Sequence, residues 1–376
     1  STAVIEPGPV LRPALRVSPA RVLLTTDVVG GVWDFAWVLT RELVARGTHV
    51  TLLALGQPSE AQTRLAGAVG AELIIEPLRL EWMQNSQADI LATQRLVNQL
   101  VDALRPDVVH ANQFAATFAG SAPVVLTLHS DVLSWRKWTL GATDLPGEWQ
   151  SYAELVRNSL ARADAVVAVS RFLADETRAL YGCQREFDVI HNGWPASSTA
   201  PVPRSGTLLA GRVWDAAKNL SLVVDALDGW SPPGPVFLAG DQRHPESGGA
   251  VELPSRITAL GLLSRPRLDQ ALSQATVYLS PALYDPFGLL PLQAALAGCA
   301  LLLSDVPSYR ELWDGAAAFF RPNDPIDLRR RWTALLEDPT GFAHRAGERA
   351  RDRYTADCMA YQYLDVYARV TAPVRA

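Results

Sequence analysis

The sequence has 376 residues, of which 48% are hydrophobic and 19% are charged, and its formal net charge is -5. This length predicts two or three domains, and the composition is typical of a globular protein. No basic block indicates a nucleic-acid partner, no apolar run approaches the ~20 residues that a membrane span needs, and the three cysteines form neither a metal-binding pattern nor a disulfide framework.

Residues 1–20 contain four prolines and no apolar core, which predicts a loose N-terminal arm rather than a signal peptide. The cysteines, Cys183, Cys299 and Cys358, are widely spaced, as is usual in a reducing compartment. We therefore expect a soluble cytoplasmic protein.

Short apolar runs alternate with helical patterns through both halves of the chain, which predicts an α/β protein with parallel sheets built from βαβ units. Seven runs in the first half predict one doubly wound, Rossmann-like domain over residues 21–194. The expected strands of this domain span residues 22–26, 50–55, 73–76, 108–110, 124–129, 166–169 and 187–191.

Residues 195–206 are rich in Pro and Ser and lack periodicity, so we expect a linker there. A second, smaller α/β domain is predicted over residues 207–355, followed by a helix over residues 356–370. From its pattern alone, the aromatic face of this helix suits the core of the second domain. The expected strands of the second domain span residues 208–211, 236–240, 277–280, 300–304 and 317–320.

Two candidate binding segments follow predicted strands of the first domain. Gly30 and Gly31 lie after the first strand, where ligands of doubly wound sheets collect and where glycines let the backbone approach a charged group. The loop lacks the Gly-x-Gly-x-x-Gly spacing, so a nicotinamide dinucleotide is not indicated. His129 lies at the end of the fifth strand, and a neutral imidazole there can donate or accept a hydrogen bond with a hydroxyl.

Two tryptophans near these segments offer flat apolar surface to a ligand. Trp33 follows the glycine pair together with Asp34, and Trp135 lies in a loop-like region after His129. Packing in a core is the alternative for Trp33. A lid packed on its own aromatic residues, or a patch for a protein partner, is the alternative for Trp135.

A pair of cations follows the first strand of the second domain. Arg212 comes directly after a glycine, and Lys218 lies six residues further on, before a helix. Two fixed cations at a strand end can stabilise negative charge that develops on a phosphate oxygen. The alternative is that both residues are exposed and form surface ion pairs. This is the weaker reading, because the strand, the glycine and the spacing all agree with a functional role.

Residues 278–305 read as a buried strand, a loop with one acid, a helix and a second buried strand. The acid is Asp285, the helix opens at Gly288 with Pro291 in its first turn, and Gln293 lies within it. The free N–H groups of such a helix start can bind an anion such as a phosphate. An ordinary helix start with Asp285 as a cap-like residue is an equally good reading of this stretch by itself.

Taken together and in this order, the motifs resemble those of glycosyltransferase family 4, retaining enzymes of the GT-B fold. The family carries a glycine pair, a strand-end histidine, an arginine and lysine pair, and two glutamates that bracket a Phe-Gly-Leu segment. Here Asp285 and Gln293 stand at the two glutamate positions, and Phe287, Gly288 and Leu289 lie between them. The resemblance covers nearly the whole chain, and it implies that the terminal helix crosses back onto the first domain.

The resemblance implies a retaining hexosyltransferase that moves a sugar from a nucleoside-diphosphate sugar to an acceptor hydroxyl, without a metal ion or a resident cofactor. It implies catalytic roles for Arg212, Lys218, Asp285 and His129, and acceptor contacts from Trp33, Asp34, His129 and Trp135. The donor contacts that it implies are Gly30, Gly31, Arg212, Lys218, Asp285, Phe287, Gly288, Leu289, Leu290 and Gln293.

Two other functions stay open at this point. A sugar-nucleotide epimerase of the same GT-B architecture would release no glycoside. The changed residues at positions 285 and 293 also suit a non-catalytic nucleotide-sugar sensor or partner subunit. For a transferase, the acceptors that fit are a sugar, another small molecule or a glycolipid, and the last of these would bring the protein into peripheral contact with a membrane.

Overall fold

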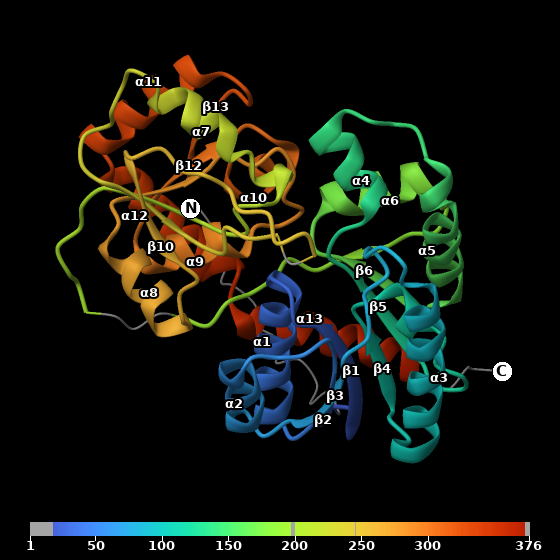
Figure 1. Cartoon of the computed structure of the whole chain (residues 1–376). Helices are drawn as coiled ribbons and strands as arrows, with labels where there is room; N and C mark the ends of the chain where they lie inside the picture. The colour runs from blue at the N-terminus through green and yellow to red at the C-terminus, as the bar shows by residue number, and fades with distance from the viewer. Residues whose placement is uncertain (1–17, 197–199, 245, 373–376) are drawn as a thin grey trace, which may run out of the picture.

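The computed structural model describes residues 18–196, 200–244 and 246–372. They form two α/β domains, each built on one parallel sheet with helices around it (Figure 1). The fold prediction of two Rossmann-like domains is therefore confirmed. Of the expected N-terminal arm, residues 1–17 lie outside the described residues, as do residues 197–199 of the expected linker.

The first sheet has seven parallel strands in the order β3-β2-β1-β4-β5-β6-β7. The order reverses between β1 and β4, and the crevice at such a switch point is where doubly wound sheets bind ligands. The last strand is shorter than predicted, because only two of its residues pair with β6. The strands are β1 (Arg21–Asp27), β2 (His49–Leu55), β3 (Glu72–Glu76), β4 (Val108–Ala111), β5 (Val124–Leu128), β6 (Ala165–Ala168) and β7 (Asp188–Val189).

The second sheet has six parallel strands in the order β10-β9-β8-β11-β12-β13, again with a switch point beside its first strand. Sequence patterns predicted five of them and missed β10. This edge strand is not an apolar run, because Thr258 and Ala259 are exposed. The strands are β8 (Thr207–Ala210), β9 (Val236–Ala239), β10 (Ile257–Gly261), β11 (Val277–Ser280), β12 (Ala300–Ser304) and β13 (Ala318–Phe320).

Helices flank both sheets, with α1, α2 and α13 on one side of the first sheet and α3 and α5 on the other (Figure 1). No helix among the described residues is long and apolar enough to cross a bilayer. The helices are α1 (Gly31–Ala45), α2 (Glu60–Ala68), α3 (Gln87–Leu104), α4 (Val132–Trp135), α5 (Gln150–Arg162), α6 (Arg171–Tyr181), α7 (Leu220–Leu227), α8 (Arg265–Gln274), α9 (Leu289–Ala297), α10 (Pro307–Trp313), α11 (Pro325–Glu337), α12 (Thr340–Arg353) and α13 (Ala356–Thr371).

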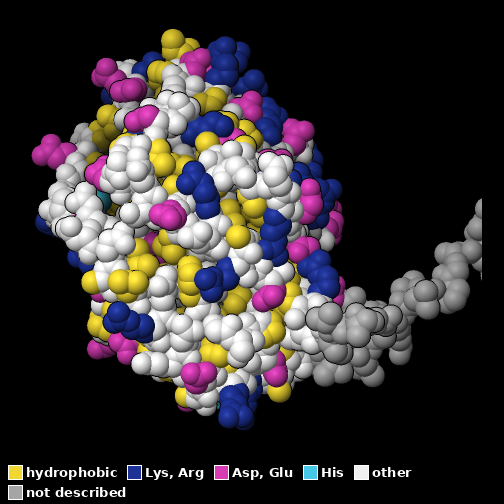
Figure 2. All heavy atoms as spheres, turned by 90° about the vertical axis from the view of Figure 1, so that its right-hand side faces the viewer, with side chains coloured by type: hydrophobic (Ala, Val, Ile, Leu, Met, Phe, Trp, Pro, Cys, Tyr) yellow, Lys and Arg dark blue, Asp and Glu magenta, His cyan; other side chains and the backbone are white. Residues whose placement is uncertain are grey.

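Acidic and basic side chains alternate over the face of the molecule shown in Figure 2. No extended patch of one charge is visible on the described part of this face. Charges of both signs over this face do not produce the single-sign field that steers a polyanion.

The terminal helix α13 packs its aromatic face against α1 and the first sheet. Tyr367 Oη lies 2.6 Å from His110 Nδ1, and Tyr363 Oη lies 3.1 Å from Thr127 Oγ1. The ring of Tyr363 also meets that of Phe35 edge to face at 5.6 Å. The last helix of the chain therefore completes the core of the first domain.

Replacing Tyr363 by alanine should lower the free energy of unfolding by about 3 to 5 kcal/mol, because it empties a fully buried aromatic site between α13 and the sheet. Urea unfolding followed by circular dichroism measures the change. Tyr361 on the same helix is 52% exposed, so Tyr361→Ala serves as the matched control, with an expected loss below about 1 kcal/mol. Equal losses in the two variants would contradict this packing.

Candidate active site

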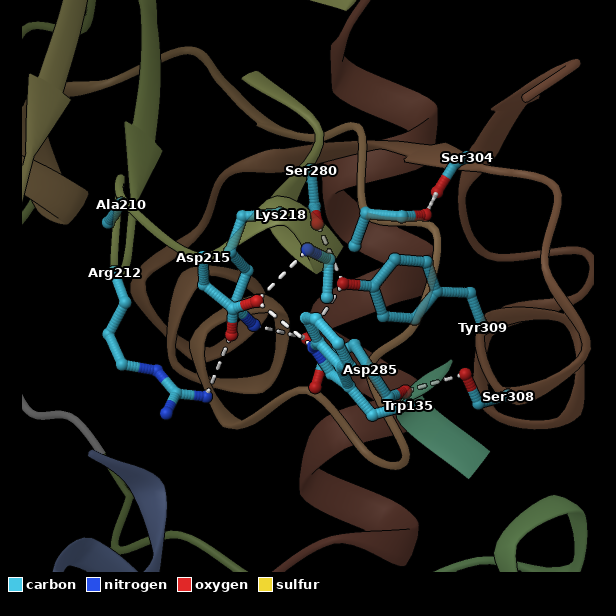
Figure 3. A network of polar contacts seen from close by, with 12 residues as sticks. Trp135, Ala210, Arg212, Asp215, Lys218, Ser280, Asp285, Ser304, Ser308 and Tyr309 are labelled. Atoms are coloured by element: carbon cyan, nitrogen blue, oxygen red, sulfur yellow. Dashed lines mark hydrogen bonds and ion pairs between the residues drawn. The ribbon is translucent and has the colours of Figure 1, made fainter. Parts of the chain in front are cut away.

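Arg212 and Lys218 both lie at the carboxyl edge of the second sheet, just after β8 (Figure 3). Arg212 Nη2 is 3.3 Å from Asp215 Oδ2, and Lys218 Nζ is 3.4 Å from Asp285 Oδ2. Both cations remain partly exposed. They are thus held in place by carboxylates of their own domain and are still open to an anionic ligand.

Close packing of the backbone at the ends of β8 and β9 determines where these two cations lie. Gly211 has φ +138°, and a Cβ there would lie 3.8 Å from Lys218 Cε and from Leu290 Cδ1. A Cβ on Gly240, at the end of the neighbouring strand, would lie 1.8 Å from the carbonyl oxygen of Gly211. Glycines at both strand ends therefore let the two loops meet and bring Lys218 next to the start of α9.

Asp285 is fixed by α10 as well as by Lys218 (Figure 3). Tyr309 Oη donates to Asp285 Oδ2 at 2.9 Å, and Ser308 Oγ donates to the carbonyl oxygen of Asp285 at 2.6 Å. Tyr309 is fully buried, and its Oη also lies 2.7 Å from Ser280 Oγ. Asp285, which is shorter than the glutamate of the family, therefore has one carboxylate oxygen, Oδ2, bound to the protein.

The helix start at α9 is built as the sequence predicts. Gly288 has φ +86°, and a Cβ there would lie 2.9 Å from Tyr309 Cε1 and 3.2 Å from Asp285 Oδ2. Phe287 and Gln293 are only 3% and 4% exposed, so Phe287 presents its backbone rather than its ring to the site. The N–H groups of Leu289 and Leu290 lie in the first turn, where backbone N–H groups have no partner within the helix.

The glycine pair of the first domain faces these groups of the second domain directly. A Cβ on Gly30, where φ is +81°, would lie 3.7 Å from Arg212 Nε, and a Cβ on Gly31 would lie 3.5 Å from Leu289 Cδ1. Segments about 180 and about 260 residues apart in the sequence therefore meet at one place between the two sheets.

His129 is held neutral at the end of β5. Its Nε2 donates to Asn112 Oδ1 at 2.7 Å, because the amide nitrogen of Asn112 is used on the carbonyl oxygen of Thr25. Burial lowers the pKa of His129 to about 3. The imidazole therefore stays uncharged at neutral pH, with Nδ1 left as a hydrogen-bond acceptor.

Two carboxyl groups that the sequence reading missed lie on the first-domain side. Burial raises the pKa of Asp27, at the end of β1, to about 6, although the N–H of Val29 and the charge of Arg212 oppose it. Burial also raises the pKa of Glu81 to about 7, and its Oε1 accepts from the N–H of Phe114 at 2.7 Å. Asp27 is the last residue of a strand and His129 directly follows one, and such a place at a strand end is a usable signal. Glu81 lies in a loop without a pattern.

The predicted acceptor residues divide into two groups. Asp34 and Trp135 reach across to the second domain: Asp34 Oδ1 pairs with Arg265 Nη2 at 2.5 Å, and Trp135 Nε1 donates to Asp215 Oδ1 at 3.2 Å. The structure does not place Trp33 with them, because its side chain is 3% exposed and packs in the core of the first domain.

Further contacts tie the two domains together around this place. Ser130 Oγ lies 2.9 Å from Tyr284 Oη. Glu311 of α10 accepts from the N–H groups of Arg171 and Phe172, in the first turn of α6, at 2.7 and 3.0 Å, and it pairs with His191 Nε2 at 2.9 Å. Among the described residues, no group of three or more His, Cys, Asp or Glu is arranged to hold a metal ion.

Two facing Rossmann-like domains with cations and a helix start at their boundary define the GT-B class. Sucrose-phosphate synthase from Thermosynechococcus elongatus shares this fold with a TM-score of 0.75 and 18% identity, over 93% of this chain and 98% of the other. Anabaena HepE, solved in complex with UDP and glucose, has a TM-score of 0.69 and 16% identity, over 93% and 100%.

Sequence profiles identify the family. The Glycosyltransferase Family 4 profile matches residues 29–197, and the Glycosyl transferases group 1 profile matches residues 208–353. The chain belongs to glycosyltransferase family 4, and it is a glycosyltransferase of glycan biosynthesis.

Curated relatives agree with this assignment. An α-maltose-1-phosphate synthase of Mycobacterium tuberculosis is 26% identical over 312 residues, which is 70% of this chain and 79% of the relative. A phosphatidyl-myo-inositol mannosyltransferase of Mycolicibacterium smegmatis is 26% identical over 373 residues, or 92% of each chain.

The raised pKa of Glu81 predicts a pH dependence of stability. The folded protein holds this proton more tightly than the unfolded chain, so stability is full below the ordinary pKa of 4.5 and falls as the pH rises through about 7. Glu81→Gln removes this loss, and its free energy of unfolding relative to wild type should rise by about 2 kcal/mol between pH 4.5 and pH 8. Urea titrations at both pH values measure it, and an equal difference at the two would contradict the assignment.

Proposed function

We propose that this glycosyltransferase transfers a sugar from a nucleoside-diphosphate sugar to an acceptor hydroxyl, with retention of configuration and without a metal ion. One observation carries the proposal: Arg212, Lys218 and the start of α9 converge opposite the glycine pair at Gly30. Each of these groups binds or admits negative charge.

The diphosphate is the ligand that this charge pattern fits best. Its oxygens accept from guanidinium, ammonium and backbone N–H groups, all of which lie along the cleft. Arg212 and Lys218 form ion pairs with Asp215 and Asp285. A bound diphosphate would replace these carboxylates as the partner of the two cations. The HepE structure, which shares this fold and was solved in complex with UDP and glucose, supports a nucleoside diphosphate as the ligand.

The remaining groups suit the two ends of the donor. Asp285 would accept from sugar hydroxyls through the carboxylate oxygen that Tyr309 and Lys218 do not hold. The amide of Gln293 would contact the ribose. His129, neutral at neutral pH, would accept from a sugar hydroxyl through Nδ1.

The reaction would proceed on one face of the sugar. The bond between the anomeric carbon and the diphosphate oxygen breaks, while a bond to the acceptor oxygen forms on the same side. The acceptor proton passes to the departing phosphate oxygen, whose growing charge Arg212 and Lys218 stabilise. Contacts across the domain boundary keep water from the donor and so limit its hydrolysis.

The acceptor half of the cleft belongs to the first domain. His129 and the aromatic segment around Trp135 lie there, as does Asp34. A sugar, a small molecule or a glycolipid headgroup presents the hydroxyl that this proposal requires.

Lys218→Ala and Arg212→Ala should each lower kcat/KM for sugar transfer by about 10² to 10³, because each removes a cation from the charge that develops on the leaving group. Mass spectrometry of product formed from UDP-, GDP- and ADP-sugars measures the rate, and isothermal titration with the three nucleotides measures binding. Arg345→Ala on α12 is the control, since this exposed side chain bonds only the carbonyl oxygen of Gly315 and stacks on Phe342.

Unchanged binding and turnover in both variants would overturn the diphosphate assignment. Nucleotide binding without any product from the wild type would favour a nucleotide-sugar sensor, and conversion of the donor without a glycoside would favour an epimerase.

Wild-type activity should be the same with and without an excess of EDTA, because two protein cations and a helix start occupy the place of a metal ion. The anomeric coupling constant of the product in proton NMR should match that of the donor sugar. Loss of activity in EDTA that Mg²⁺ restores would contradict metal independence, and an inverted product would contradict the proposed displacement.

A further inference from the structure

Arg265, the first residue of α8, contacts side chains of both domains. Its Nη2 pairs with Asp34 Oδ1 of α1 at 2.5 Å, and its Nη1 donates to Gln293 Oε1 of α9 at 3.4 Å. Its guanidinium also lies over the rings of Trp194, at 4.7 Å, and Trp37, at 5.7 Å. The side chain is 23% exposed, so these contacts surround most of it.

The ion pair with Asp34 joins the two domains. Asp34 is 27% exposed on its side chain, so the pair is partly shielded from water and worth more than a fully exposed one. The other charged side chain that acts on both partners is Asp269, one turn along α8. It belongs to the second domain and cannot replace Asp34 as a contact across the boundary.

The amide at position 293 decides which partner Arg265 takes. A carboxylate there would compete with Asp34 for the same guanidinium, and it would do so within the second domain. The amide oxygen of Gln293 is uncharged and accepts only a weak bond. It therefore leaves the charge of Arg265 to Asp34. The bond from Arg265 also fixes the orientation of the Gln293 amide. Because Oε1 accepts from Arg265, the NH₂ group is left for a ligand.

We propose that Arg265 is a positioning residue that closes the domains through Asp34 and orients Gln293, so that a first-domain residue sets the affinity of the nucleotide site in the second. The inference rests on the proposed function for its ligand, since it takes Gln293 as a contact of the nucleotide. The glutamine at position 293, where the family has glutamate, is then part of the contact that closes the domains. Its effect is not limited to a changed contact with the ribose.

The test uses the full chain and two measurements. Small-angle X-ray scattering without a ligand reports closure as the radius of gyration, and isothermal titration with UDP, GDP and ADP reports nucleotide affinity. Asp34→Asn should increase the radius of gyration and weaken binding of the preferred nucleotide by about 5-fold or more, although residue 34 lies in the other domain. Gln293→Glu should also open the protein, because it draws Arg265 away from Asp34.

A charge-swapped double variant, Asp34→Arg with Arg265→Asp, separates this role from a general loss of stability. It should restore the wild-type radius of gyration but only part of the lost affinity, because an aspartate at position 265 cannot donate to Gln293 Oε1. Arg267→Ala is the matched control on α8, because this arginine is exposed, and it should behave as wild type.

An unchanged radius of gyration in Asp34→Asn would overturn the closing contact. An opened Asp34→Asn protein with wild-type affinity would overturn the coupling to the nucleotide site. If the wild type binds no nucleotide, the proposed function fails, while the scattering of the same variants still decides whether Arg265 closes the domains.

Discussion

The candidate site depends on two cations that carboxylates of their own domain hold at the carboxyl edge of the second sheet. Arg212 and Lys218 are each paired at more than 3 Å with a carboxylate of their own domain, which is weak enough for a diphosphate to displace. Glycines at the ends of β8 and β9 bring Lys218 beside the start of α9. Groups of three kinds that bind anions, guanidinium, ammonium and helix N–H, therefore lie close together at this edge, and the proposed diphosphate site is built on them.

The second determinant is the closeness of the two domains. Gly30 and Gly31 approach Arg212 and Leu289 at contact distance because they carry no side chain. Around this contact, side chains of one domain bond to groups of the other: Trp135 to Asp215, Asp34 to Arg265, and Glu311 to the first turn of α6. In a transferase these bonds exclude water, and water is the acceptor that would destroy the donor. Asp215 both positions a cation and joins the domains, since it pairs with Arg212 and accepts a hydrogen bond from Trp135 Nε1.

Sequence patterns predicted what local physics determines. Parallel strands buried on both faces read as apolar runs, so twelve of the thirteen strands in the described part of the chain were anticipated. The glycine and cation motifs followed from their places at strand ends. Edge strand β10 was missed because it is partly exposed. Tyr309, Glu81 and Arg265 were missed for another reason: each acts through a partner far away in the sequence, at Asp285, Phe114 or Asp34. Trp33 is the opposite case: its place beside the glycine loop predicted a ligand contact, but its side chain is buried in the core. A tryptophan beside such a loop is equally able to turn into the core.

The most direct test of the central claim is a crystal structure of the chain with a bound nucleoside diphosphate. We expect the phosphate oxygens to lie within hydrogen-bond distance of Arg212, Lys218 and the N–H groups of Leu289 and Leu290, with Asp215 and Asp285 released from the two cations. A diphosphate bound elsewhere, with both ion pairs intact, would contradict it.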